Sequence, residues 1–99
     1  MDDPSDSTNT AEHKFMLFVS GMSVKSGHAI ENLRKICDKY LADNYELEII
    51  DISRDKEQAL IHQIVAIPTL IKTDPAPQRI ILGDLSDKQK VLRILNISE

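Results

Sequence analysis

Apolar and polar residues follow two different periods along this chain, and together they predict a mixed α/β fold. A continuous apolar run from Phe15 to Val19 ends at Gly21, which is typical of a strand buried on both faces. Apolar residues at three-and-four spacing from residue 30 to 41 then predict an amphipathic helix, with Ser23 as its expected N-cap. Residues 43–45 are expected to end this helix.

A second strand and a shorter helix are predicted next. Residues 46–52 alternate at first and then become apolar, which favours a strand. Ser53 or Asp55 is expected to open a helix that runs through residue 61, with Ala59 and Leu60 facing inward.

The last part of the chain predicts a hairpin and a final helix. Residues 64–71 lead into a third strand interrupted at its start by Pro68, and 74–77 form a turn before a fourth strand at 79–82. After a turn at 83–85, Ser86 and Gln89 have the spacing of a capping box. The helix that follows is expected to bury Val91, Leu92 and Leu95. The order is βαβ followed by αββα, and its first crossover requires a parallel pair of strands.

Composition and charge narrow the possible functions. The chain has 99 residues, enough for one domain, with 41% hydrophobic and 28% charged residues. Four of its 16 acidic residues, Asp2, Asp3, Asp6 and Glu12, precede the first Lys or Arg, and the remaining 12 balance the 12 basic residues. Residues 1–13 are therefore expected to be a disordered acidic tail, and residues 14–99 a single domain. Because that domain is formally neutral, nucleic acid is not an expected partner.

The sequence also predicts neither a targeting signal nor a cluster of metal-binding or nucleophilic side chains. The N-terminus lacks a positive and apolar leader, and no apolar run approaches the ~20 residues of a membrane helix, so we expect a cytoplasmic protein with no membrane contact. His13, His28 and His62 have no metal-ligand spacing, and we expect neither metal nor cofactor. The single cysteine, Cys37, falls on the apolar stripe of the first helix and is expected to be a buried, inert thiol.

The order of elements, with a proline before the third strand, resembles the thioredoxin fold. In that fold Ile67-Pro68-Thr69 resembles the segment that carries a cis-proline. The redox pair would lie between the first strand and the first helix, where this chain reads Ser23-Val24-Lys25-Ser26. Because a serine oxygen has no thiolate chemistry, disulfide exchange at this position is excluded and we expect no enzyme.

A finer resemblance is to the KaiB circadian clock protein family, which is related to thioredoxin but lacks the cysteines. The resemblance runs from about residue 15 to the end of the chain. The segments that carry it are Phe18-Val19-Ser20-Gly21, Tyr45-x-Leu47-x-Ile49-Ile50-Asp51, Ala66-Ile67-Pro68-Thr69-Leu70-x-Lys72, Pro75-x-Pro77 and Arg79-Ile80-Ile81-x-Gly83-Asp84-Leu85-Ser86.

This resemblance implies a non-enzymatic adaptor that docks on the N-terminal ATPase ring of KaiC, helps to sequester KaiA and displaces a sensor histidine kinase. It also implies fold switching, between a dimeric or tetrameric βαββααβ ground state and a thioredoxin-like βαβαββα monomer. The fold class is thus a thioredoxin-like α/β sandwich, with the ground-state order as the alternative. By resemblance, Pro68, Gly83 and Asp84 are the expected fold-switch residues, and the expected partner-binding residues are Lys25, His28, Lys72 and Arg79.

Two other functions stay open at this stage. The chain departs from the family pattern at His28, Glu48 and residues 61–63, which leaves a KaiB-related stress-response module that never meets KaiC. The other is a thiol-dependent redox enzyme that relies on Cys37 alone.

Overall fold

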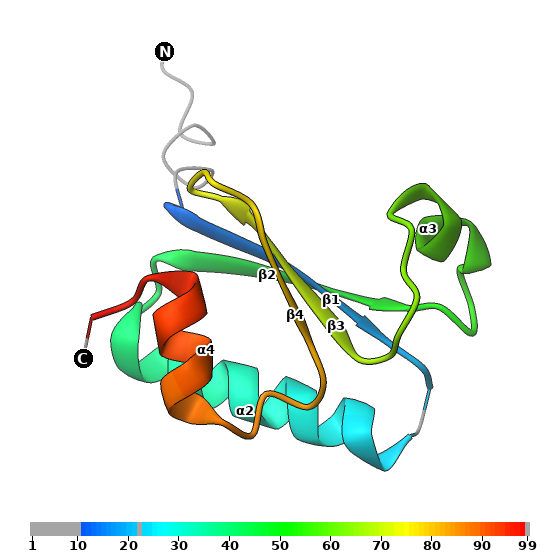
Figure 1. Cartoon of the computed structure of the whole chain (residues 1–99), viewed down its shortest axis with the longest axis horizontal. Helices are drawn as coiled ribbons and strands as arrows, with labels where there is room; N and C mark the ends of the chain where they lie inside the picture. Colours follow the sequence, from blue (N-terminus) through cyan, green and yellow to red (C-terminus); the bar gives the residue numbers. More distant parts are fainter. Residues whose placement is uncertain (1–10, 22, 99) are drawn as a thin grey trace.

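A four-stranded sheet and three helices make up the fold (Figure 1), in a computed structural model that describes residues 11–21 and 23–98. The elements in chain order are β1 (His13–Val19), α2 (Val24–Tyr40), β2 (Tyr45–Asp51), α3 (Lys56–Ile61), β3 (Thr69–Asp74), β4 (Arg79–Leu82) and α4 (Lys88–Leu95). This is the βαβαββα order of the thioredoxin-like prediction, and the alternative ground-state order is not the one adopted here.

The strands lie in the order β2-β1-β3-β4. β1 and β2 are parallel, as the crossover through α2 requires, while β3 pairs antiparallel with both β1 and β4. The predicted hairpin is confirmed, with Leu70 opposite Ile81 and Lys72 opposite Arg79.

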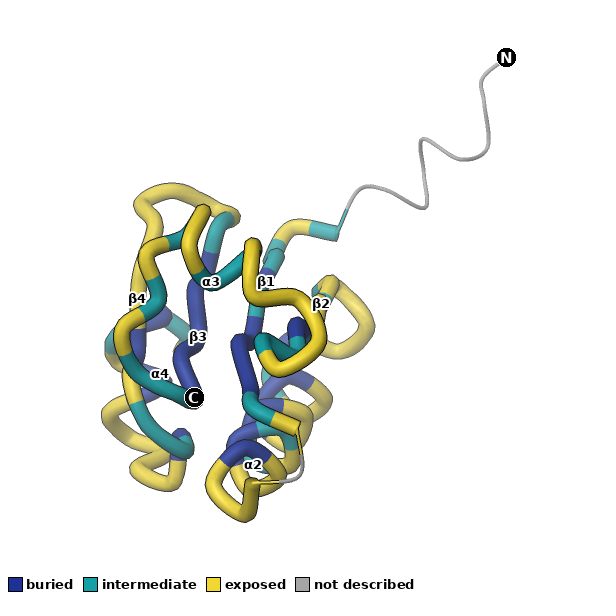
Figure 2. The backbone as a smooth tube through the Cα atoms, turned by 90° about the vertical axis from the view of Figure 1, so that its right-hand side faces the viewer, coloured by how far each residue is buried: buried dark blue, intermediate teal, exposed yellow. Residues whose placement is uncertain are grey.

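The main core lies between the sheet and the helices α2 and α4. Alternate residues of β1 point into it, and α2 contributes the stripe that the three-and-four spacing predicted. In Figure 2 the buried segments run through β1, β3 and part of α2. The buried members are Phe15, Leu17, Val19, Ala29, Leu33, Ile36, Cys37, Leu41, Leu70, Ile81, Leu85, Val91, Leu92 and Leu95.

The other face of the sheet carries a smaller cluster of Phe18, Ile50 and Ile71. Burial of both faces of β1 is thereby confirmed. The inward orientation predicted for Leu60 is wrong, because Leu60 on the short helix α3 is 78% exposed. Six residues are too few to cover this face, so the loop after α3 supplies Ile64 and Ile67 instead.

Several predicted element boundaries are corrected. The tail was expected to extend to residue 13, but His13 already pairs with Tyr45 in the β1–β2 ladder; residues 1–10 lie outside the described residues. The helix α4 is capped by Asp87, whose carboxylate accepts from the Lys90 N–H, and not by Ser86. No helix among the residues described is long and apolar enough to cross a bilayer.

Candidate functional site

Two serines organise the start of α2, at the positions where the thioredoxin fold carries its redox pair. Ser23 is the N-cap as predicted, and its Oγ accepts from the Ser26 N–H at 3.1 Å. The Ser23 hydroxyl also donates to Ser26 Oγ at 2.6 Å, and Ser26 Oγ accepts the Ser20 N–H at 3.1 Å. These hydroxyls satisfy backbone donors at the helix start. Because these two positions carry hydroxyls and not thiols, the two side chains hold the β1–α2 connection and cannot carry out thiol–disulfide exchange.

Asp51, at the end of β2, fastens the same connection from the neighbouring strand. Its Oδ1 accepts from the Gly21 N–H at 2.9 Å and from the backbone and hydroxyl of Ser53. The Ser53 hydroxyl first, and then the backbone N–H groups of Gly21 and Ser53, lower the pKa of Asp51 from its usual 3.8. Sequence reasoning missed this anchor, because only the parallel β1–β2 register brings it to Gly21.

Two of the three expected fold-switch residues are in direct contact. Pro68 is fully buried before β3, with a cis Ile67–Pro68 peptide bond as the thioredoxin-like form expects. Gly83 follows β4 at φ +107°, and its N–H donates to the Pro68 carbonyl at 2.9 Å. This positive φ is a conformation that glycine adopts without a Cβ penalty.

Asp84 connects this corner to α2. Its carbonyl accepts from Asn32 Nδ2 at 2.9 Å, and its Oδ1 accepts from the Ser86 N–H at 3.1 Å. The Ser86 hydrogen bonds, with smaller contributions from the positive side chains of Lys25 and His28, hold the pKa of the Asp84 carboxyl below its usual value. Lys25 and His28 are both exposed on the first turns of α2. The fold therefore brings these two basic residues close to Asp84, and we call Lys25, His28 and Asp84 the corner patch.

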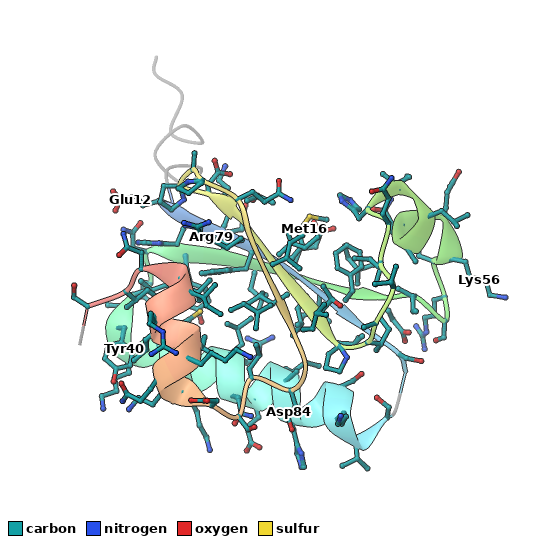
Figure 3. The ribbon with its side chains drawn as sticks, viewed as in Figure 1. Glu12, Met16, Tyr40, Lys56, Arg79 and Asp84 are labelled. Carbon is teal, nitrogen blue, oxygen red and sulfur yellow. The ribbon has the colours of Figure 1, made fainter. Side chains whose placement is uncertain are left out.

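Lys72 and Arg79 lie elsewhere. They face each other across β3 and β4, toward the turn of the hairpin, and Figure 3 places Arg79 well away from Asp84. Lys72 is only 3% exposed. Both line a cavity of about 200 Å³ that also includes His13 and Arg93. The four expected partner-binding residues thus do not form one surface.

Cys37 is buried within α2, as expected. Burial is the largest cause that raises the pKa of its thiol to about 12, and the neighbouring Asp38 adds to the rise. A thiol with this pKa and no solvent access is neither a nucleophile nor a redox centre at neutral pH.

An apolar groove on the second face of the sheet was not predicted. Its cavity measures about 350 Å³, and its lining includes the exposed apolar side chains of Val65, Ile80 and Leu82. Because side chains alternate along a strand, the sequence of β4 already indicates that Ile80 and Leu82 share one face of the sheet. That this face stays exposed could not be predicted, because it depends on α3 being too short to cover it. Among the residues the structure describes, no group of three or more His, Cys, Asp or Glu could hold a metal ion.

Comparison with known proteins identifies the family. The family model described as KaiB domain matches residues 16–97. The chain belongs to the KaiB family. It is 43% identical over 81 residues to the circadian clock protein KaiB3 of Synechocystis, covering 82% of this chain and 79% of that protein. It is 40% identical over 76 residues to the circadian clock oscillator protein KaiB of Microcystis aeruginosa, covering 77% of this chain and 73% of that one.

Solved structures place this KaiB family member in the thioredoxin-like fold. The thioredoxin Deadhead of Drosophila melanogaster matches with a TM-score of 0.70 at 12% identity, covering 93% of this chain and 86% of that one. The N-terminal domain of SasA from Synechococcus elongatus matches with a TM-score of 0.68 at 22% identity, covering 85% and 83%. At these identities the likeness concerns the fold.

Proposed function

We propose that this KaiB family protein is a cytoplasmic, non-enzymatic regulator that binds a KaiC-type ATPase ring in a circadian-clock or clock-derived system. The observation that carries the proposal is the pairing of a KaiB family match over residues 16–97 with a thioredoxin-like fold whose redox positions hold two serines. A thioredoxin-like chain without the redox thiols cannot exchange disulfides, so we expect it to function by binding other proteins through its surface.

The corner patch is the proposed contact surface. It combines the exposed basic side chains of Lys25 and His28 with the Asp84 carboxylate, on a scaffold held by the Asn32–Asp84 hydrogen bond. Mixed charge on a rigid scaffold favours specific, oriented docking over general attraction to polyanions. A sensor histidine kinase with a similar N-terminal domain would compete for the same ring surface, and the SasA domain has a matching fold.

A conformational change at the β4–α4 corner is also part of the proposal. Pro68 and Gly83 are joined by one hydrogen bond, and Gly83 supplies a positive φ at the point where the chain turns from sheet to helix. In the alternative fold, this hydrogen bond and the path of the chain after Gly83 would both differ. Self-association into dimers or tetramers would accompany that second fold.

Co-elution with the ATPase tests the proposal directly. The full chain, at tens of micromolar, is incubated for a day with the KaiC-type ATPase of the same genome and ATP, and then passed over a size-exclusion column. We expect a peak in which both proteins co-elute. If no complex forms under these conditions, the proposed binding to a KaiC-type ATPase is wrong and a KaiB-related stress-response module is favoured. The exposed residues His28 and Glu48, where the sequence departs from the family pattern, are the observation that supports this alternative.

A further inference from the structure

The cavity at the C-terminal end of α4 is lined by basic side chains. It lies between the first residue of β1, the turn that joins β3 to β4, and the last turn of α4. Four of its lining residues, Lys72, His13, Arg79 and Arg93, carry basic groups, and no Asp or Glu is among the rest. The Glu12 carboxylate lies 4.0 Å from His13 Nε2, and it is mostly exposed and also accepts from Asn44.

Lys72 is the unusual member of this group. The residue is 97% removed from solvent as a whole, but its ammonium is not among the buried polar atoms that lack a partner, so Nζ keeps contact with solvent where the side chain lines the cavity. A lysine can bury its aliphatic stem and keep its charged end at a solvent-filled surface. Lys72 therefore presents a positive charge at the cavity, where an anionic ligand could bind it in place of water.

We propose that this cavity is a binding site for a small oxyanion, specifically the phosphate group of a metabolite or inorganic phosphate. Arg79 and Arg93 carry guanidinium groups that can form paired hydrogen bonds with a phosphate, and Lys72 supplies a further positive charge to the lining. The cavity volume of about 200 Å³ is several times the ~30 Å³ of one liquid water, so a tetrahedral oxyanion fits within it.

A titration of the full chain with inorganic phosphate tests the site. Amide NMR spectra are recorded at constant ionic strength, with chloride replaced stepwise by phosphate. We expect saturable shifts confined to the residues that line the cavity. Arg93→Gln should weaken the affinity at least fivefold and Lys72→Met at least tenfold, whereas Arg34→Gln, an exposed arginine of α2 outside the cavity, should change it less than twofold.

The outcome that overturns the proposal is equally specific. Shifts that stay linear in phosphate concentration and spread over all exposed lysines, or equal affinities in all variants, would show screening of surface charge only. Should Lys72→Met fail to fold, Arg93→Gln decides the matter alone, because Arg93 is exposed and its loss leaves no buried group unpaired.

A second arm distinguishes a free anion from a carboxylate of the chain itself. Asp6 precedes His13 by seven residues, a span of at most about 25 Å, so the acidic N-terminal segment is within reach of the cavity. The titration is repeated on the variant in which Asp2, Asp3 and Asp6 are all Asn. Unchanged affinity supports a free phosphate as the ligand, and a gain of tenfold or more would assign the cavity to these carboxylates and overturn it.

Discussion

The backbone N–H of Gly83 donates a hydrogen bond of 2.9 Å to the carbonyl of Pro68. This bond extends the β3–β4 ladder one step beyond the Thr69–Leu82 pair and closes the hairpin at the end where α4 begins. It joins two of the three residues that the family resemblance predicts to take part in fold switching. A change of backbone path at Gly83 must therefore break a contact to Pro68.

Gly83→Ala should penalise the fold described here. At φ +107° the Cβ of an alanine clashes with the backbone atoms of its own residue and its chain neighbours, although no other atom lies within 4 Å of the new Cβ. The expected cost is about 1 kcal/mol, or roughly a fivefold change in population. Amide NMR spectra should show a second set of folded peaks that grows in the variant. One identical set of peaks, with only a lower melting temperature, would mean that the chain has a single fold.

Gly27→Ala is the matched control for that substitution. Gly27 lies within α2 at an ordinary helical φ, and a Cβ there also meets nothing within 4 Å. Alanine in a helix interior is favoured over glycine by about 1 kcal/mol. Denaturant unfolding should show higher stability for this variant, with no new peaks.

Much of this fold could be predicted because the spacing of apolar residues along the sequence indicates which face of each helix or strand is buried. The stripe on α2 and the run in β1 both predicted the correct faces, and Ser23 was identified as an N-cap from its residue type and position. The same reasoning failed for Leu60, because a helix of six residues does not decide by itself which side meets the sheet. It also failed at Ser86, since Asp87 one position later is an equally good cap.

The candidate site was harder to predict, because its residues meet only through tertiary packing. Pro68 and Gly83 share a contact that follows from the β3–β4 register, which the hairpin turn made foreseeable. Arg93, by contrast, lines the same cavity as Lys72 only because α4 packs beside β4, with its last turn near the hairpin. No local pattern in the sequence gives the direction in which α4 packs.

Ser26→Ala should destabilise the protein by about 1–3 kcal/mol. The Ser26 side chain is buried and accepts the Ser20 N–H, which would be left without a partner. Chemical denaturation of the variant and the wild-type protein measures the difference. Ser98→Ala, at an exposed position after α4, serves as the control and should change stability by less than about 0.5 kcal/mol. Equal stabilities for all three proteins would contradict the hydrogen-bond network described here.

Cys37 should be unreactive in the native protein. With a pKa of about 12 the thiolate fraction at pH 8 is on the order of one in ten thousand, and the sulfur is also enclosed by the core. Ellman's reagent should therefore react only after denaturant is added. Turnover in an insulin or peroxide reduction assay that disappears in Cys37→Ser would revive the redox alternative.

Asp51→Asn should remove a pH-dependent part of the stability. Because the folded-state pKa of Asp51 lies below its unfolded value of 3.8, its carboxylate stabilises the fold above pH 3.8, and this contribution is lost as the pH falls through the lower folded-state pKa. Urea unfolding at pH 6 should show the variant to be less stable than wild type. The gap should narrow as the pH is lowered below 3.8. A gap that stays constant with pH would show that the charge of Asp51 is not responsible.

The affinity of the full chain for its KaiC-type ATPase, measured by biolayer interferometry with ATP present, tests the central claim most directly. The account predicts that Lys25→Glu, which reverses a charge within the corner patch, weakens binding at least tenfold. Lys35→Glu, an exposed lysine further along the same helix, should bind within twofold of wild type. Equal binding by both variants, or no binding by the wild-type chain, would contradict the claim that this KaiB family protein acts by docking its corner patch on an ATPase ring.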